Sequence, residues 1–166
     1  MEASVHVRDA TPDDFERINT IYNCTIVDSH VSFESDPWDI ARRREWWDGR
    51  PDGLDVLVAE IEGQVVGVAY SSLYRPKPAY RSSVETTIVL DTGYLGRGIG
   101  TALLGSLIER LRERGFHRAI AIVALPNEAS IALHHRLGYR TAGTLTEVGY
   151  KLGRHWDTTL LEIDLG

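Results

Sequence analysis

A glycine-rich loop between two predicted elements carries residues suited to binding an anion. It follows a segment with β-branched residues at positions 82–90 and opens into an amphipathic segment at positions 100–114. The loop combines small residues, one cation and one hydroxyl: Gly96, Arg97, Gly98, Ile99, Gly100 and Thr101. Glycine permits positive φ and close approach of a ligand to the backbone, and a helix N-terminus favours negative charge. The pattern therefore predicts an anion site, with a pyrophosphate as the expected ligand.

Four interpretations of this loop compete. A Walker A loop requires a lysine after its last glycine, whereas Gly100 is followed directly by Thr101. A dinucleotide-binding fold requires an acidic residue at the end of the next strand, which here ends in Ala-Leu-Pro at 124–126. The loop resembles the acyl-CoA loop of the GNAT acetyltransferase superfamily, Arg/Gln-x-x-Gly-x-Gly/Ala, at Gly98 and Gly100, but Leu95 replaces the Arg or Gln. An ordinary glycine-rich turn is the fourth interpretation.

Composition limits the class of protein. The chain has 166 residues, of which 43% are hydrophobic and 25% charged, which is typical of one globular domain spanning residues 1–166. A net charge of −6 disfavours nucleic acid as a partner. The single cysteine, Cys24, excludes an internal disulfide and a cysteine zinc cluster, and no metal site is expected. No apolar run approaches the ~20 residues of a membrane span and no signal peptide is recognised, which predicts a cytoplasmic protein without a membrane partner.

Periodicity and capping residues predict one sheet with helices packed on it. A helix is expected after Thr11-Pro12, another from Asp36-Pro37, and Asn127 is expected to cap a helix at 128–137. Glu62-Gly63 predicts a hairpin turn. The predicted strands are short and lie around residues 5–7 and at 55–61, 64–73, 82–90, 118–125, 144–152 and 157–165. This order of elements predicts a single mixed α/β domain built around one sheet.

Three further segments resemble one branch of the GNAT superfamily, the phosphinothricin N-acetyltransferases. They read RPKPAYRSSVETTIVL at 75–90, ALPNEASIALHHRLGYRTAGTLTEVGYKLGRHWDTTLL at 124–161, and FESDP at 33–37. The resemblance covers nearly the whole chain and implies a mostly antiparallel sheet of about six to seven strands flanked by about four helices. It also implies a homodimer that transfers acetyl from acetyl-CoA to the α-amino group of phosphinothricin, methionine sulfoximine, methionine sulfone or a related amino acid.

That chemistry needs a base, because an α-amino group with a pKa near ~8 is largely protonated at neutral pH. From spacing alone Glu85 is better interpreted as a solvent-facing strand residue or the partner of Arg81, whereas the resemblance implies that it is this base. His134 matches a histidine placed near the reaction, and packing is its alternative role. Tyr139 matches a tyrosine that lies near the cofactor sulfur and protonates the leaving thiolate, with a core aromatic as the alternative.

The resemblance also assigns binding residues. Asn127 contacts the pantetheine arm besides capping its helix, and the backbone of three residues pairs with the pantetheine amides: Ile88, Val89 and Leu90. Arg75 and Lys77 match basic residues on the substrate side, where a phosphinate or sulfone needs donors. Four more residues complete the acceptor site, two as an apolar wall and two as hydroxyls for the carboxylate: Phe33, Tyr80, Thr86 and Thr87. The Tyr150-Lys151…His155-Trp156-Asp157 segment resembles the family's C-terminal hairpin and is interpreted as structural and as a candidate subunit contact.

Direct transfer in a ternary complex is expected, because the only thiol, Cys24, lies far from these motifs in the sequence. Two alternatives remain open. The first is a GNAT enzyme with another acceptor, such as a polyamine, an aminoglycoside or a protein N-terminus, although Arg75 and Lys77 disfavour a polycation. The second is a non-catalytic CoA-binding module.

Overall fold

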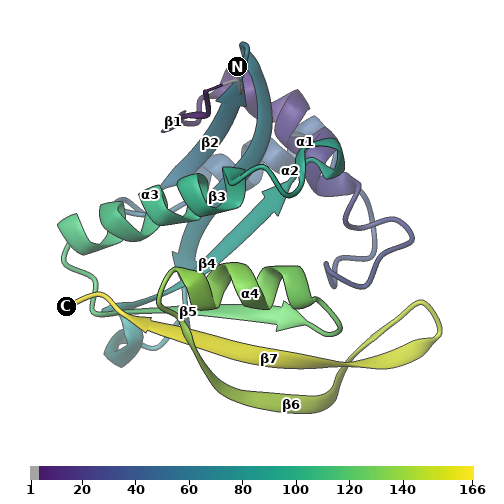
Figure 1. The fold of residues 1–166 in the computed structure, drawn as a ribbon, viewed down its shortest axis with the longest axis vertical. Coiled ribbons are helices and arrows are strands. Elements are labelled where there is room, and N and C mark those ends of the chain that lie inside the picture. The colour runs from purple at the N-terminus through teal and green to yellow at the C-terminus, as the bar shows by residue number, and fades with distance from the viewer. Residues whose placement is uncertain (1–3) are drawn as a thin grey trace.

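A seven-stranded sheet runs through the molecule in a computed structural model that describes residues 4–166 (Figure 1). Its order is β1-β2-β3-β4-β5-β7-β6, and all neighbours are antiparallel except β4 and β5. The strands are β1 (His6–Asp9), β2 (Val56–Ile61), β3 (Gln64–Leu73), β4 (Ser83–Leu90), β5 (Arg118–Ala124), β6 (Arg140–Lys151) and β7 (Arg154–Asp164). The helices described are α1 (Phe15–Asn23), α2 (Ile40–Asp48), α3 (Ile99–Glu113) and α4 (Glu128–Arg136). The predicted mixed fold is confirmed.

Each face of the sheet is covered by a different pair of helices. Leucines of α3 such as Leu104 and Leu107 pack with inward residues of β2–β5 and β7, and apolar side chains of α4 join this cluster. On the other face, α1 packs against valines of β2 and β3 with Trp46 and Trp47 of α2 at the margin. Because side chains alternate along a strand, the even residues of β4 face α3 and α4 and the odd ones face α1 and α2.

The start of α2 differs from the sequence-based expectation. The helix begins at Ile40, capped by Asp39, whose carboxylate accepts from the Arg42 amide at 2.8 Å. The expected start at Asp36-Pro37 is wrong because both backbone groups of Trp38 are occupied by α1: its amide donates to Asn23 and its carbonyl accepts from Asn23 and Asn19. These bonds hold the chain extended before the helix.

One charged side chain of α2 lies in the core. Arg43 is only 1% exposed, and its guanidinium lies 4.4 to 4.9 Å from the ring centroids of Trp38, Tyr22 and Trp46. Its Nε donates to the Asn19 amide oxygen at 2.7 Å. Aromatic faces thus solvate the cation where water is excluded.

The two predicted hairpins form, with shifted bounds for the second. Glu62 and Gly63 both have positive φ, as a two-residue turn between β2 and β3 requires. β6 and β7 pair as expected and turn at Leu152-Gly153, but each begins earlier than predicted, at Arg140 and Arg154. β6 is mostly exposed, and its pairing with β7 is irregular near its start, between Thr141 and Gly143. This explains why the alternating pattern did not mark that start.

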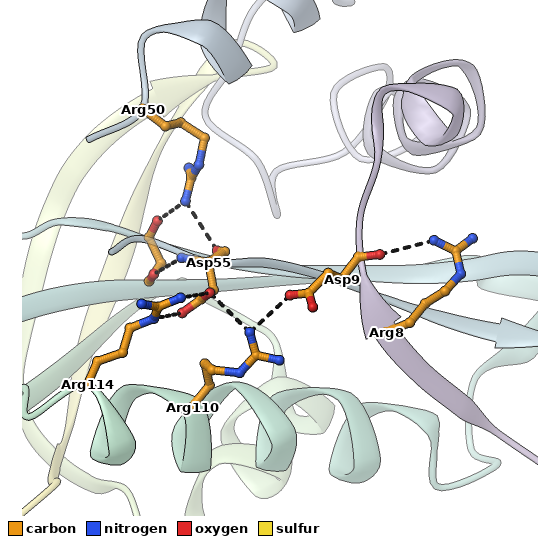
Figure 2. A network of polar contacts seen from close by, with 7 residues as sticks. Arg8, Asp9, Arg50, Asp55, Arg110 and Arg114 are labelled. Carbon is orange, nitrogen blue, oxygen red and sulfur yellow. Dashed lines mark hydrogen bonds and ion pairs between the residues drawn. The ribbon is translucent and has the colours of Figure 1, made fainter. Parts of the chain in front are cut away.

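A charged network fixes the C-terminal half of α3 to the edge of the sheet (Figure 2). Asp55, just before β2, accepts two bonds from Arg114 at 2.6 and 2.7 Å and one from Arg110 at 3.3 Å. Arg110 also pairs with Asp9 of β1 at 3.0 Å, and Arg50 donates to the Asp55 carbonyl at 3.2 Å. The network therefore anchors the C-terminal end of α3, whose other end begins at the glycine loop.

β4 and β5 separate partway along their length. They pair in parallel only from Ser83↔Arg118 to Glu85↔Ile120. Beyond that point β4 stays paired with β3 as far as Leu90, and β5 stays paired with β7 as far as Ala124. The inner edges of the two strands therefore leave backbone groups without a strand partner. Within residues 4–166, each helix is too short or too polar to cross a membrane.

Candidate active site

Glu85 lies at the last β4–β5 pair, where the strands begin to separate. Its side chain is half-buried on the α1/α2 face, which it shares with Thr87. Burial raises the pKa of the Glu85 carboxyl, and the positive charge of Arg75 partly offsets this. Among residues 4–166 it forms no ion pair, so the alternative of a salt bridge with Arg81 is not realised. A carboxylate whose pKa is raised by burial is a stronger proton acceptor than an ordinary glutamate.

Thr86 points to the opposite face. It is buried, and its hydroxyl lies 2.8 Å from the Tyr139 hydroxyl. The two predicted carboxylate-binding hydroxyls, Thr86 and Thr87, therefore face different helix layers, and only Thr87 shares the face of Glu85.

Tyr139 and His134 form a buried pair beside the strand opening. Each is 3% exposed, and their rings meet edge to face with centroids 4.9 Å apart. Burial raises the pKa of Tyr139 to about 12, so the phenol retains its proton. Burial lowers the pKa of His134, whose Nδ1–H donates to the Ser130 carbonyl at 2.7 Å. A neutral imidazole thus supports a phenol in the form needed to donate a proton. His135 lies outside this pair, exposed and 3.0 Å from the Thr141 hydroxyl.

The glycine loop is prepared for a ligand at the start of α3. Gly96 and Gly98 have φ of 76° and 74°, and Gly98 is the N-cap of α3 with no side chain bonded to the first helical amides. The N–H groups of Ile99, Gly100 and Thr101 form the first turn of the helix and therefore have no intrahelical partner. Leu95 is 58% exposed at the position where the superfamily has Arg or Gln, while the Arg97 guanidinium lies 5.1 Å from the Tyr94 ring centroid.

A contact that the sequence did not predict orients the start of this loop. Asp91, the first residue after β4, accepts from the Gly93 amide at 2.9 Å and pairs with Arg17 of α1. Arg17 also donates to the Val65 carbonyl at 2.8 Å. The only signal in the sequence was an aspartate immediately after a strand, because its partner lies 74 positions away.

Asn127 caps α4 as predicted. Its side-chain oxygen accepts from the Ser130 amide at 3.2 Å, which leaves its NH₂ group available. A cavity of about 750 Å³ lies between α4 and the β6–β7 hairpin, and Asn127 is the one predicted site residue that lines it. This cavity is therefore separate from the surroundings of Glu85.

The other predicted acceptor residues lie in two connecting segments. Arg75, Lys77 and Tyr80 are exposed on the segment between β3 and β4. Tyr74 links two of them: its ring centroid is 5.3 Å from the Arg75 guanidinium and 5.6 Å from the Tyr80 ring. Phe33 is 42% exposed on the loop between α1 and α2. The structure thus brings Arg75 toward Glu85. The Lys77 side chain forms no hydrogen bond or ion pair with residues 4–166.

Comparison with known proteins decides the family. The profile of the Acetyltransferase (GNAT) family matches residues 16–139. The chain belongs to this family. As a GNAT acetyltransferase it is 42% identical to a phosphinothricin N-acetyltransferase of Streptomyces coelicolor, over 96% of both chains. It is 37% identical to an L-methionine sulfoximine/L-methionine sulfone acetyltransferase of Pseudomonas aeruginosa, covering 98% of this chain and 95% of the relative.

Solved structures agree with the architecture of this GNAT enzyme. A phosphinothricin acetyltransferase from Sinorhizobium meliloti, solved in complex with AcCoA, superposes with a TM-score of 0.93 at 34% identity over 98% of this chain and 89% of that one. Membership of the GNAT family favours the GNAT interpretation of the glycine loop over the Walker A and dinucleotide-binding interpretations. The chain is an N-acetyltransferase that uses acetyl-CoA.

Proposed function

We propose that this enzyme acetylates the α-amino group of a small amino acid or analogue of the phosphinothricin, methionine sulfoximine or methionine sulfone type. The observation that carries the proposal is the placement of Glu85 and Tyr139 on opposite sides of β4, at the point where β4 leaves β5. The names of the relatives support this acceptor class. Transfer is direct, in a ternary complex, because Cys24 is on α1's C-terminal side and no other thiol exists.

The residues of the cofactor site fit acetyl-CoA. The inner edge of β4, at Ile88, Val89 and Leu90, offers backbone groups to the pantetheine amides, since β5 does not pair there. Gly96–Thr101 offers free amides and Arg97 a charge to the pyrophosphate, and the Asn127 NH₂ group offers a donor to the pantetheine arm. When bound, acetyl-CoA supplies an acetyl group activated as a thioester.

Glu85 and Tyr139 then divide the proton transfers. Glu85 accepts a proton from the acceptor ammonium, directly or through water, and so frees the amine lone pair for attack. Tyr139, with its proton retained by burial, donates toward the sulfur that leaves. His134, whose pKa is lowered by burial, packs edge to face against the Tyr139 ring.

Acceptor recognition combines charge and shape. Arg75 and Lys77 supply positive charge to a phosphinate, sulfone or sulfoximine group. Thr87 supplies a hydroxyl for the carboxylate, whereas Thr86 is committed to Tyr139. Phe33 and Tyr80 form the apolar wall. This site suits an anionic or zwitterionic acceptor and disfavours a polycation.

An acceptor panel tests the proposal. Thiol release from acetyl-CoA is measured with phosphinothricin, methionine sulfoximine, methionine sulfone, spermidine, kanamycin and a short peptide, and products are identified by mass spectrometry. We expect acetylation of the three amino acids, with kcat/KM at least about tenfold above that of the other acceptors. Preferential turnover of the polyamine or peptide refutes the acceptor class, and binding of CoA with no turnover of any amine favours a non-catalytic module.

We further propose a cytoplasmic homodimer. β6 exposes several apolar side chains of an edge strand: Leu145, Val148 and Tyr150. An uncovered edge of this kind is a typical site of self-association, and the exposed, unpaired Cys24 suits a reducing compartment. Sedimentation equilibrium of the wild type and of Val148→Asp tests the assembly, and a monomeric wild type refutes it.

A further inference from the structure

The loop between α1 and α2, residues 24–39, is held by the β6–β7 hairpin as well as by its flanking helices. We refer to it as the acceptor loop because it carries Phe33. It lies on the face toward which Glu85 points: Ser32 lies beside the Tyr22 phenol, and Tyr22 is close to Tyr70, the β3 residue opposite Thr87. The position of this loop therefore affects the same side of the sheet as the proposed acceptor site.

Lys151, at the end of β6, binds the acceptor loop at two points. Its Nζ donates to the carbonyl of Ile26 at 2.7 Å and to that of Ser32 at 2.6 Å. Within residues 4–166 it forms no ion pair with a carboxylate, and desolvation lowers the pKa of its ammonium group, with Glu34 opposing. A surface lysine ordinarily keeps its charge in water. Here that charge joins two turns of a loop that has no strand or helix of its own.

Gly149, two residues earlier on the same face of β6, makes room for Phe33. A Cβ at this position would lie 2.2 Å from Cε2 and 2.4 Å from Cζ of the Phe33 ring. Gly149 does not have a positive φ, so the glycine is not needed for the backbone conformation. The three nearest atoms all belong to Phe33. The missing side chain is therefore what allows the ring to rest against β6.

A third contact joins the loop to the cofactor side. His30 bonds the Pro126 carbonyl at 2.8 Å, just before Asn127, and its ring stacks on Trp156 of β7 at 4.4 Å. Trp156 in turn donates to the Lys151 carbonyl at 2.8 Å. The hairpin thus contacts the acceptor loop through side chains near both ends of the turn.

We propose that Gly149 and Lys151 are positioning residues that determine acceptor specificity. They hold the acceptor loop against β6 and so determine the position of the Phe33 ring in the acceptor site. The inference rests on the proposed function, because it takes Phe33 as part of the acceptor wall. It gives a role to the hairpin segment 149–156, which takes no part in the proton transfers assigned to Glu85 and Tyr139.

Gly149→Ala tests whether the space at Gly149 determines the position of the Phe33 ring. The added methyl group must displace the ring, so the acceptor KM rises about tenfold, while kcat and the acetyl-CoA KM change by less than about twofold. In a Phe33→Ala background the same substitution has no further effect, because there is no ring to displace. Gly143→Ala, elsewhere on β6, is the matched control, since its Cβ meets nothing within 4 Å. An unchanged acceptor KM, or an equal effect with and without Phe33, overturns the inference.

Lys151→Met and Lys151→Arg test the two carbonyl bonds. The methionine keeps much of the length but donates nothing, so the acceptor KM rises with calorimetric CoA affinity preserved, and arginine restores part of the loss. Gel filtration of each variant shows whether a rise in the acceptor KM comes instead from a change of oligomeric state. A parallel loss of CoA affinity, or a methionine variant that matches wild type, overturns the role of Lys151.

A spectroscopic measurement separates this inference from the acceptor assignment. With 4-fluorophenylalanine at position 33, the ¹⁹F resonance shifts in Gly149→Ala and not in Gly143→Ala, whether or not an acceptor has been found. If the wild type acetylates none of the panel but the resonance still shifts, the proposed function is refuted, while the contact between Phe33 and β6 at Gly149 is supported. An unshifted resonance in Gly149→Ala refutes the contact between Phe33 and β6.

Discussion

The hydroxyls of Thr86 and Tyr139 lie 2.8 Å apart beside the opening between β4 and β5, and the neighbouring Glu85 points the other way. The pleat of a single strand therefore places a proton acceptor on one face and a phenol on the other. An acceptor and a thioester that meet at the opening have access to both.

Glu85→Gln removes the base and keeps the shape. We expect kcat to fall by about 10²- to 10⁴-fold while calorimetric CoA affinity stays unchanged, because the carboxylate acts on the acceptor amine and not on the cofactor. Near wild-type kcat across the pH range, measured with the preferred acceptor, contradicts the assignment of the base.

The pH profile of kcat/KM reports the same group. Burial raises the pKa of Glu85, and the carboxyl must be ionised to accept a proton. Activity is therefore lost as the pH falls through this raised pKa, in a limb that lies above the usual range of glutamic acids. The limb is absent from the residual activity of Glu85→Gln; its persistence in that variant points to another titrating group.

Tyr139→Phe removes the proposed proton donor. We expect kcat to fall by about 10- to 100-fold with little change in either KM, since the ring still fills the core. Because burial raises the pKa of Tyr139 to about 12, the phenol stays protonated and the wild type shows no loss of kcat from this residue up to about pH 10. Thr86→Val, which keeps the phenol, is the control; an equal loss in both variants indicates packing in place of proton donation.

Gly98→Ala tests the cofactor loop. At φ of 74° an alanine is strained, although its Cβ meets nothing within 4 Å. A cost of about 1–2 kcal/mol from the left-handed conformation should distort the loop and weaken calorimetric CoA affinity by about tenfold. Gly143→Ala, with ordinary φ and open space, should leave it unchanged. Unaltered affinity in Gly98→Ala refutes the pyrophosphate site.

Asp55→Asn tests the network at the far end of α3. Asp55 is nearly buried and holds both Arg110 and Arg114, so its loss should lower the free energy of unfolding by about 2 kcal/mol, measured in urea. Asp9→Asn removes only an exposed partner of Arg110 and should cost less than about 1 kcal/mol. Equal effects of the two substitutions contradict a central role for Asp55.

Local signals predicted much of this structure. The Glu62-Gly63 turn, the Asn127 cap and the glycine loop before α3 depend on residues within a few positions of one another, so the sequence displays them directly. The candidate site residues from Glu85 to Thr101 also lie on one continuous segment, so their spacing could be read from the sequence.

Contacts between distant segments were not predictable in the same way. The start of α2 moved because Asn19 and Asn23 bind the backbone of Trp38. Lys151 and its partner Ile26 are 125 positions apart. The opposite orientation of Thr86 and Thr87 follows from alternation, but assigning each to a face required knowing which helices cover it.

The free edge of β4 at the opening between β4 and β5 also bears on the stability of the fold. A ligand that pairs with the free edge of β4 binds the native chain and not the unfolded one, so it stabilises the protein by about 2.7 kcal/mol at a concentration of 100 times its Kd. If acetyl-CoA binds at this edge as proposed, a small molecule completes the sheet, and the free energy of unfolding rises with the concentration of that molecule.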